Sequence, residues 1–230
     1  MDWAPDWMIE YVVNFLIKNH VKATWFFTHF SPAIETIKQK VDLFEIGIHP
    51  NCLPGSTQGN SEDEVLQYVK VIAPDATIMR THGLYQSTSF LKKAALDYGI
   101  LIDVSLFLPR VVNLTQYYMK FNRSGIWRVP YFWEDDYEML EDNPIWKLSD
   151  PRLHVKGLKV FNFHPAYIVL NTDKFNVYEK LKKERPFNTW NSEFIQPYIK
   201  NGQGPKTLFL ELLGYLSRSG GKWIKEIIFI

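Results

Sequence analysis

The stretch ATWFFTHFSPAIETIKQKVDLFEIGIHP, residues 23–50, holds a complete strand–helix–strand unit. Residues 23–28 are β-branched and aromatic, which favours a strand. Residues 31–40 begin with Ser-Pro, a capping residue followed by a first-turn proline, and predict a helix. Residues 43–48 form a second short apolar run that ends at His49. Two strands joined by a helix in this way predict a parallel pair.

The same alternation of strands and helices continues on both sides of this unit. Upstream, apolar residues at helical spacing predict a helix over residues 7–19, with Asp6 as its capping residue. Downstream, helices are expected after capping serines, and strands are expected where a short apolar run ends in a polar residue. The expected helices are 61–72 and 89–98, and the expected strands are 77–79, 100–102, 126–129 and 158–163.

Strands that alternate with helices predict an α/β fold in which helices cover a parallel sheet. The sheet is either a barrel or an open doubly wound sheet, and we favour a distorted (β/α) barrel. The length suits one such domain and no repeat divides the chain, so residues 1–230 are expected to form a single domain. Residues 171–204 are expected to form a long loop. A helix over 207–218 and a last strand over 225–230 are expected to follow.

The charge balance argues against two classes of partner. The chain has 26 basic and 25 acidic residues and a net charge of +1, so nucleic acid and anionic membranes are not expected as main partners. No apolar run has the length of a membrane span and no secretion signal is evident, so we expect a cytoplasmic location. The single Cys52 cannot form an internal disulfide. Aromatic residues make up 16% of the chain, which suits a surface that stacks on sugar rings.

Ionisable side chains gather at the carboxyl ends of the expected strands. In α/β folds these ends meet at one edge of the sheet, where active sites form. Taken singly, each residue has a structural explanation: a histidine can be a hydrogen-bonded core residue, an aspartate can cap a helix, and an arginine can form an ion pair. The needs of packing alone do not explain why so many ionisable side chains stand at strand ends. The residues concerned are Asp2, His49, Arg80, His82, Asp103 and His164.

These residue types suit a metal-assisted hydrolysis. Neutral imidazoles and a carboxylate bind borderline divalent ions such as zinc, cobalt or nickel, and three protein ligands leave a position open for water. The ion lowers the pKa of that water and makes it a nucleophile near neutral pH. A separate imidazole can protonate the leaving group. His164, on a different strand from His49, is placed for this second task.

Five short segments resemble the motifs of polysaccharide deacetylases, also called carbohydrate esterase family 4. Residues 44–49, FEIGIH, resemble the block that opens the family's metal motif, and residues 23–27, ATWFF, resemble the strand before it. Residues 80–83, RTHG, resemble the arginine-containing third motif. Residues 161–165, FNFHP, resemble the last motif, whose histidine acts as the acid. Asp2-Trp3 resembles the end of the opening motif, so the motifs follow one another in the family's order.

The resemblance implies a metal ion, a catalytic acid and a sugar subsite. Where the family has a second metal-binding histidine this chain has Leu53, so His82 is the first candidate to replace it, and Asn51 and His29 are weaker ones. The expected ligands of a divalent ion, which is zinc or else cobalt or nickel, are Asp2, His49 and His82. The expected catalytic residues are His164 as the acid, with Arg80 and Asp103 to orient or tune the base. The expected substrate-binding residues are Asn51, Tyr131 and Trp133, and the rings of the last two would form the wall of a sugar subsite.

Two features set this chain apart from the common family pattern. The His-Pro-Asn at 49–51 resembles a divergent branch that is associated with surface-polysaccharide biosynthesis. The family's first strand precedes its catalytic aspartates, whereas only Met1 precedes Asp2 here. We therefore expect the first strand of the barrel to be missing and the barrel to be open beside the strand at 24–28, with an unpaired sheet edge.

The sequence is compatible with three functions. The first is a hydrolase that removes an acyl group, N-acetyl above all, from a sugar of a surface polysaccharide or its precursor. The second is a hydrolase of the same architecture that acts on linear amides or ureides. The third is a catalytically silent glycan-binding or scaffold protein; the missing second histidine favours it, and the ionisable groups at the strand ends oppose it. We favour the first, with a carbohydrate as substrate.

Overall fold

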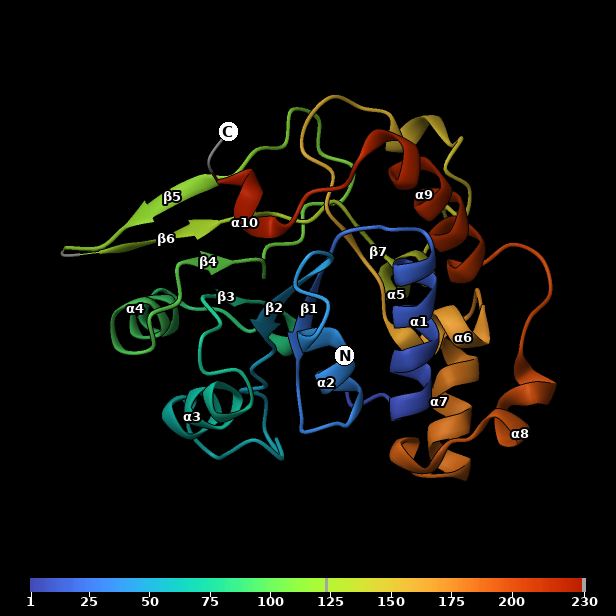
Figure 1. The fold of residues 1–230 in the computed structure, drawn as a ribbon, viewed down its shortest axis with the longest axis horizontal. Helices are drawn as coiled ribbons and strands as arrows, with labels where there is room; N and C mark the ends of the chain where they lie inside the picture. Colours follow the sequence, from blue (N-terminus) through green and yellow to red (C-terminus); the bar gives the residue numbers. More distant parts are fainter. Residues whose placement is uncertain (123, 229–230) are drawn as a thin grey trace.

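A six-stranded sheet forms the centre of the computed structural model, which describes residues 1–122 and 124–228. Its strand order is β1-β2-β3-β4-β6-β5 (Figure 1). All neighbours are parallel except β5, which pairs antiparallel with β6 and was not foreseen from the sequence. The strands are β1 (Ala23–Phe27), β2 (Phe44–Ile48), β3 (Ile78–Met79), β4 (Ile102–Asp103), β5 (Tyr117–Lys120) and β6 (Gly125–Arg128).

A second, two-stranded parallel sheet consists of β7 (Trp133–Glu134) and β8 (Phe161–Asn162). β8 is shorter than the strand expected over 158–163. Within the described residues, β1 pairs with β2 alone, so β1 is an edge strand, as expected. The parallel strands place the residues that follow them at one edge of the fold. The predicted α/β class with parallel strands is confirmed.

Helices connect the strands and cover the sheet (Figure 1). The predicted cap Ser61 is present and accepts a hydrogen bond from the Glu64 N–H. The helix expected from residue 89 begins at Thr88, and its cap, which was not predicted, is Ser87, which accepts a hydrogen bond from the Phe90 N–H. No helix in the described ranges is long and apolar enough to cross a membrane. The helices are α1 (Asp6–Lys18), α2 (Ala33–Lys38), α3 (Glu62–Ile72), α4 (Thr88–Asp97), α5 (Asp135–Glu138), α6 (Pro165–Leu170), α7 (Phe175–Glu184), α8 (Ser192–Ile195), α9 (Pro205–Ser219) and α10 (Ile224–Ile227).

Three local predictions are wrong. Asp6 does not cap α1; it lies in the first turn, where its carboxylate accepts a hydrogen bond from Ser31. Residues 171–204 are not one loop, because they contain α7 and α8. The expected strand at 225–230 is a helix in its described part, because buried Ile224 and Ile227 stand three residues apart, a helical spacing. Its last two residues lie outside the described residues.

Candidate functional site

His49 follows β2 directly and is fixed by its main chain. Its N–H donates to the Phe27 carbonyl at 2.9 Å, and its carbonyl accepts a hydrogen bond from the Gln58 side-chain amide at 3.1 Å. Gly47 allows the close approach of the strands here, because a Cβ atom in its place would lie 2.8 Å from the Phe26 ring. The His49 imidazole is buried. It is therefore held in one place at the carboxyl end of the sheet.

Asp2 lies over the end of β1. The Met1 amino group donates to the Phe26 carbonyl at 2.8 Å, and the Trp3 N–H donates to the Thr28 hydroxyl at 3.2 Å. Asp2, between these two anchors, has a φ of 46°, in the left-handed region that Asp tolerates better than most residues. The two hydrogen bonds fix the backbone on both sides of the Asp2 carboxylate.

The three predicted metal ligands come together. Asp2 Oδ1 lies 2.9 Å from His49 Nε2 and 3.3 Å from His82 Nδ1. One ligand atom from each residue lies within 4.8 Å of the other two. Asp2 Oδ1 and His49 Nε2 are buried and make no hydrogen bond of good geometry. Two ligands of a tetrahedral zinc ion lie about 3.3 Å apart, so the unpaired atoms and their spacing fit such an ion.

The charge of the cluster also suits a cation. Burial lowers the pKa of His49 to about 4, although the Asp2 carboxylate opposes this shift. The His49 imidazole is therefore neutral near pH 7, which is the form that binds a metal. Burial favours a raised pKa for Asp2, but the neighbouring histidines His49 and His164 outweigh it and hold the pKa well below its usual range. The cluster thus offers a carboxylate and a neutral imidazole.

His164 stands at the N-terminus of α6, between two carboxylates. Its Nε2 lies 2.8 Å from Asp2 Oδ2, and its Nδ1 lies 2.6 Å from Asp135 Oδ1. Asp135 also accepts a hydrogen bond from the His164 N–H at 2.7 Å. Burial favours a lowered pKa for His164, but the charges of Asp135 and Asp2 outweigh it and raise the pKa well above its usual value. His164 is therefore a cation near neutral pH, in contrast to His49.

Arg80 follows β3 and forms a buried ion pair with Glu134. It also donates to the Tyr131 hydroxyl at 3.2 Å, and that hydroxyl donates to Glu134 at 2.9 Å. Burial favours a lowered pKa for Arg80, but Glu134 outweighs it and raises the pKa further. Arg80 lines the same small cavity as Asp2 and His164. It therefore places a permanent positive charge beside the histidine cluster.

Three carboxylates at 134–136, none of them predicted as functional, complete the site. Asp135 orients His164 and Glu134 holds Arg80. Burial raises the pKa of Asp136 to about 7, while the charge of His164 opposes this shift. Glu134, Asp136 and His164 form a second group with the spacing of metal ligands. The contacts already described occupy Glu134 and His164, so this second group fits a metal less well than the first.

Asp103 does not join the cluster, which corrects its assignment as a catalytic residue. Its buried carboxylate lies 2.6 Å from Arg128 Nε and accepts a hydrogen bond from the Ser105 hydroxyl at 2.6 Å. Burial raises the pKa of Asp103 against the opposing charge of Arg128. This ion pair joins the ends of β4 and β6. Asp103 is therefore a structural residue of the sheet.

The two weaker ligand candidates have local partners. Asn51 Oδ1 accepts a hydrogen bond from the Leu53 N–H at 3.1 Å, which shapes the turn after His49. His29 Nδ1 lies 2.7 Å from the Thr28 hydroxyl. His29 belongs to no group of histidine, cysteine, aspartate or glutamate side chains with the spacing of metal ligands in the described part of the chain. The assignment of Asn51 to substrate binding stays a prediction.

The two aromatic residues expected to wall a sugar subsite are buried. Trp133 is 1% exposed, and its ring centroid lies 4.7 Å from that of Phe163. Tyr131 is 0% exposed and stacks on Phe107 at 4.6 Å. A ring without an exposed face cannot stack on a sugar, so this interpretation is wrong. Both residues instead contribute to the core beneath the site.

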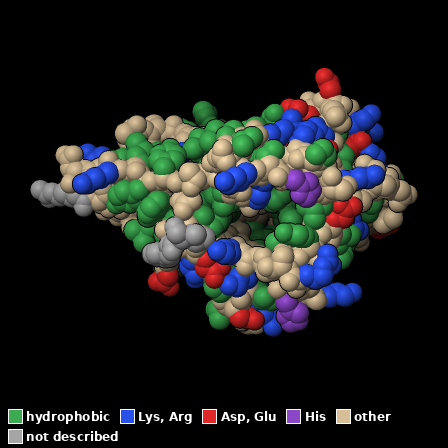
Figure 2. Space-filling view, turned by 90° about the horizontal axis from the view of Figure 1, so that it is seen from above, with side chains coloured by type: hydrophobic (Ala, Val, Ile, Leu, Met, Phe, Trp, Pro, Cys, Tyr) green, Lys and Arg blue, Asp and Glu red, His purple; other side chains and the backbone are tan. Residues whose placement is uncertain are grey.

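Two cavities adjoin these residues. The smaller, of about 60 Å³, is lined by Asp2, His49, Arg80 and His164 among others. The larger, of about 980 Å³, lies beside β1 and is not lined by Asp2, His49 or His164. On the face that carries α9 and α10, the surface is hollowed near its middle (Figure 2). The ionisable groups therefore gather at the smaller cavity.

A comparison of this chain with models of known protein families agrees with the residue pattern and the site geometry described above. The model of the WbmS-like polysaccharide deacetylases matches residues 1–182. The chain belongs to this family. The match extends over the strand ends that carry Asp2, His49, Arg80 and His164. No match was found among curated proteins.

A solved structure supports the family's fold for nearly the whole chain. It comes from Bordetella bronchiseptica, and its description connects it with polysaccharide deacetylation and O-antigen biosynthesis. The two share 29% identity with a TM-score of 0.80, over 94% of this chain and 87% of the other. A 4-alpha-glucanotransferase from Thermococcus litoralis matches at 14% identity with a TM-score of 0.46, over 95% of this chain and 43% of the other. The first match confirms the predicted fold of the deacetylase type.

Proposed function

We propose that the protein is a metal-dependent hydrolase that removes an N-acetyl group from a sugar of a surface polysaccharide or its precursor. The observation that carries this proposal is the Asp2 carboxylate, which joins neutral His49 to cationic His164. Amide hydrolysis at such a site needs both a neutral imidazole and a cationic one. A neutral imidazole can hold the metal ion that generates the nucleophile, and a cationic imidazole can protonate the leaving nitrogen.

Asp2, His49 and His82 would hold the metal ion, with zinc as the first choice and cobalt or nickel as alternatives. When bound, such an ion lowers the pKa of water and polarises the acyl carbonyl. His82 is the most exposed of the three side chains, at 34%. The side of the cluster at His82 is therefore where substrate would approach.

His164 would protonate the leaving nitrogen. The Asp135 carboxylate accepts from Nδ1, so the proton at Nε2 is the one that can be transferred. Nε2 faces Asp2, the same carboxylate that faces the metal site. The proton donor would thus lie next to the carbon under attack. The fixed charge of Arg80 would help to stabilise negative charge that develops there.

An Asp135→Asn variant is expected to move the alkaline limb of the pH–rate profile to lower pH. The Asp135 charge raises the pKa of His164, so an amide in its place lowers that pKa. Because the acid acts in its protonated form, activity is lost as pH rises through this pKa. We expect a shift of about one unit, the effect of roughly 1.4 kcal/mol of interaction. Measurement of kcat/KM from neutral to alkaline pH for both proteins tests this, and coincident alkaline limbs would refute the role of Asp135.

The sugar substrate is supported by the family and by the Bordetella protein's description, and the site adds a limit on how it binds. The small cavity of about 60 Å³ is far below the roughly 300–1,000 Å³ of typical small-molecule sites. A sugar ring would therefore lie outside this cavity, over the exposed edge of the cluster. Only the acetamido group, with the nitrogen that His164 would protonate, would reach the ionisable residues.

Acetate release is the test of this function. The zinc-reconstituted protein would be given N-acetylated amino sugars, as monomers and oligomers, and linear N-acetyl amides. We expect release from the sugars at a rate above that from the linear amides. Preference for the linear amides would favour the second function. Glycan binding without acetate release, with each of zinc, cobalt and nickel, would favour a silent binding protein.

A further inference from the structure

The Trp3 indole lies beside the metal cluster without belonging to the core. Its ring centroid lies 5.2 Å from that of His82, and the two ring planes are perpendicular. Trp3 is half-buried, and among the described residues it packs against none of the three apolar clusters that form the core. In an edge-to-face pair, His82 covers at most one face of the indole. The indole therefore keeps exposed surface directly beside a predicted metal ligand.

The other tryptophan side chains have structural partners. Trp223 donates from its indole N–H to the Leu43 carbonyl at 2.9 Å, and the Lys22 ammonium lies over its ring at 4.2 Å. The remaining tryptophans belong to the apolar clusters or pack against them: Trp7, Trp25, Trp127, Trp133, Trp146 and Trp190. Within the described residues, Trp3 is the tryptophan whose ring pairs with a predicted metal ligand. Its position therefore indicates a contact with a ligand rather than a role in packing.

The backbone at Trp3 favours a residue without a side chain. Its φ of 56° lies in the left-handed region, which is unfavourable for a bulky residue and free of steric cost for glycine. The Trp3 N–H donates to the Thr28 hydroxyl, and the Ala4 N–H donates to the Met1 carbonyl at 3.1 Å, so a fixed turn holds this conformation. Unfavourable backbone conformations of this kind gather at functional sites. The indole is thus held in one place at a conformational cost.

Trp3 also lies at the right distance from the metal cluster to hold a substrate. It follows Asp2 directly, so the two Cα atoms lie about 3.8 Å apart. The His82 ring, which the indole contacts, lies 5.6 Å from the His49 ring. The His49 side chain is 3% exposed and that of His82 is 34% exposed. The three rings therefore lead from the surface to the buried end of the cluster.

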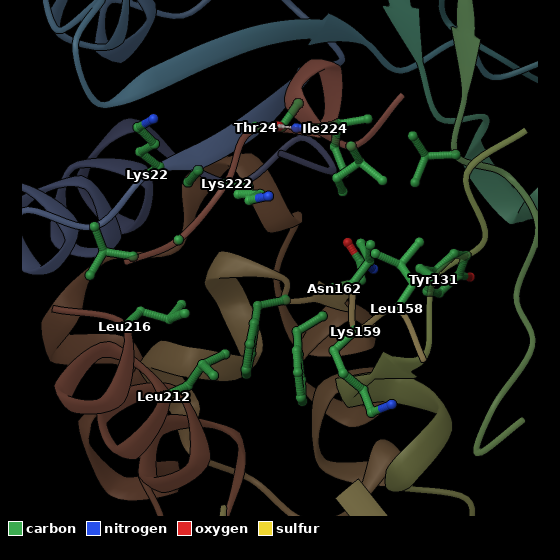
Figure 3. Close-up of a pocket in the computed structure, with 18 of the residues that line it drawn as sticks. Lys22, Thr24, Tyr131, Leu158, Lys159, Asn162, Leu212, Leu216, Lys222 and Ile224 are labelled. Carbon is green, nitrogen blue, oxygen red and sulfur yellow. Dashed lines mark hydrogen bonds between the residues drawn. The ribbon is translucent and has the colours of Figure 1, made fainter. Parts of the chain in front are cut away.

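The larger cavity is a less suitable place for a sugar ring. In Figure 3, Leu212 and Leu216 of α9 lie on one side of this cavity and Leu158 lies on the other. Sugar hydroxyls against these apolar side chains would lose hydrogen bonds to water without replacement. None of the three predicted metal ligands lines this cavity. A sugar bound there would have no metal ligand beside its acetamido group.

We propose that a ring of the sugar substrate stacks on the Trp3 indole. This inference rests on the proposed carbohydrate substrate. The face of an indole is electron-rich, so it attracts the C–H groups on one side of a sugar ring. The stacked ring would lie over the exposed edge of the cluster at His82, and its acetamido group would enter the small cavity. Trp3 thus takes the role that the sequence assigned to Tyr131 and Trp133.

A binding measurement that does not depend on hydrolysis tests this inference. The dissociation constant of an N-acetylated amino sugar oligomer is measured by calorimetry on the metal-free protein and on its Trp3→Ala and Trp3→Phe variants. We expect the constant to rise roughly tenfold in Trp3→Ala and less in Trp3→Phe, which keeps an aromatic face. The melting temperature should change little, because no core packing is lost. Equal constants for the wild-type and Trp3→Ala proteins, or no binding by the wild type, would overturn the proposal.

Trp127→Ala is the matched control. Trp127 is also half-buried, but it lies on β6 and its ring packs 5.2 Å from that of Tyr118. Because this variant loses packing and not the stacking surface, we expect a lower melting temperature and an unchanged dissociation constant. Binding that weakens as much in Trp127→Ala as in Trp3→Ala would reject a specific role for Trp3.

Kinetics of the zinc-loaded proteins separates stacking from support of His82. For Trp3→Ala we expect KM for the sugar oligomer to rise roughly tenfold, with kcat/KM for a linear N-acetyl amide and the zinc content unchanged. Loss of zinc, with both substrates slowed equally, would show that Trp3 only supports His82 and would reject stacking. Oligomer binding that depends on Trp3 without any acetate release would support stacking and refute the proposed hydrolysis.

Discussion

The His49→Ala variant is expected to lose its metal ion and its deacetylase activity together. His49 Nε2 is a buried neutral nitrogen, 2.9 Å from Asp2 Oδ1, and it makes no hydrogen bond of good geometry. Mutation even of groups that only support metal ligands lowers affinity or activity by 10- to 100-fold. We therefore expect a loss of activity of at least about 100-fold. Metal analysis by mass spectrometry and acetate release on the same sample measure both effects.

His154→Ala is the matched control for this variant. His154 is an exposed histidine whose Nε2 lies 2.7 Å from the Leu148 carbonyl, and it does not belong to the metal cluster. We expect His154→Ala to keep its metal ion and its activity. A His49→Ala protein that keeps one equivalent of metal would remove His49 from the ligand set.

The His164→Ala variant is expected to lower turnover by roughly 100-fold or more while the metal content stays unchanged. This is the usual range for the loss of a general acid. Removal of the imidazole also leaves the buried Asp135 carboxylate without its partner, which costs about 3–5 kcal/mol of stability. The rate must therefore be normalised to the folded fraction, measured by circular dichroism at the assay temperature.

The double variant Asp135→Asn with His164→Ala controls for this stability loss. It removes the unpaired charge together with the acid, so it should fold better than His164→Ala and stay equally slow. If either protein hydrolyses substrate at the wild-type rate, His164 is not the acid. A purely structural role predicts lower stability with normal turnover of the folded protein.

Local signals made much of the fold predictable. The strand that ends just before His49 and the helix capped by Ser61 depend on residues that are neighbours in sequence. The placement of Asp2, His49, His82 and His164 in one cluster followed from the rule that parallel strands end at one edge. These predictions needed only the order of the elements.

The errors arose at residues whose partners and burial are determined by tertiary packing. Asp135 was missed because its partner His164 lies 29 residues away, although the three consecutive carboxylates at 134–136 were a visible signal. Trp133 was assigned to a sugar subsite because a sequence does not distinguish a buried ring from an exposed one. Asp103 was placed in the site because its ion pair with Arg128 forms only when β4 and β6 are adjacent.

The central claim is that one metal ion held by Asp2, His49 and His82 enables hydrolysis by this site. The most direct measurement is a titration of metal-free protein with zinc, in which bound zinc and acetate release from an N-acetylated amino sugar oligomer are followed together. We predict that the rate rises in proportion to bound zinc and reaches a plateau at about one equivalent, as expected for three ligands around one ion. Full acetate release by the metal-free protein, or zinc binding that is unchanged in an Asp2→Asn variant, would contradict this account.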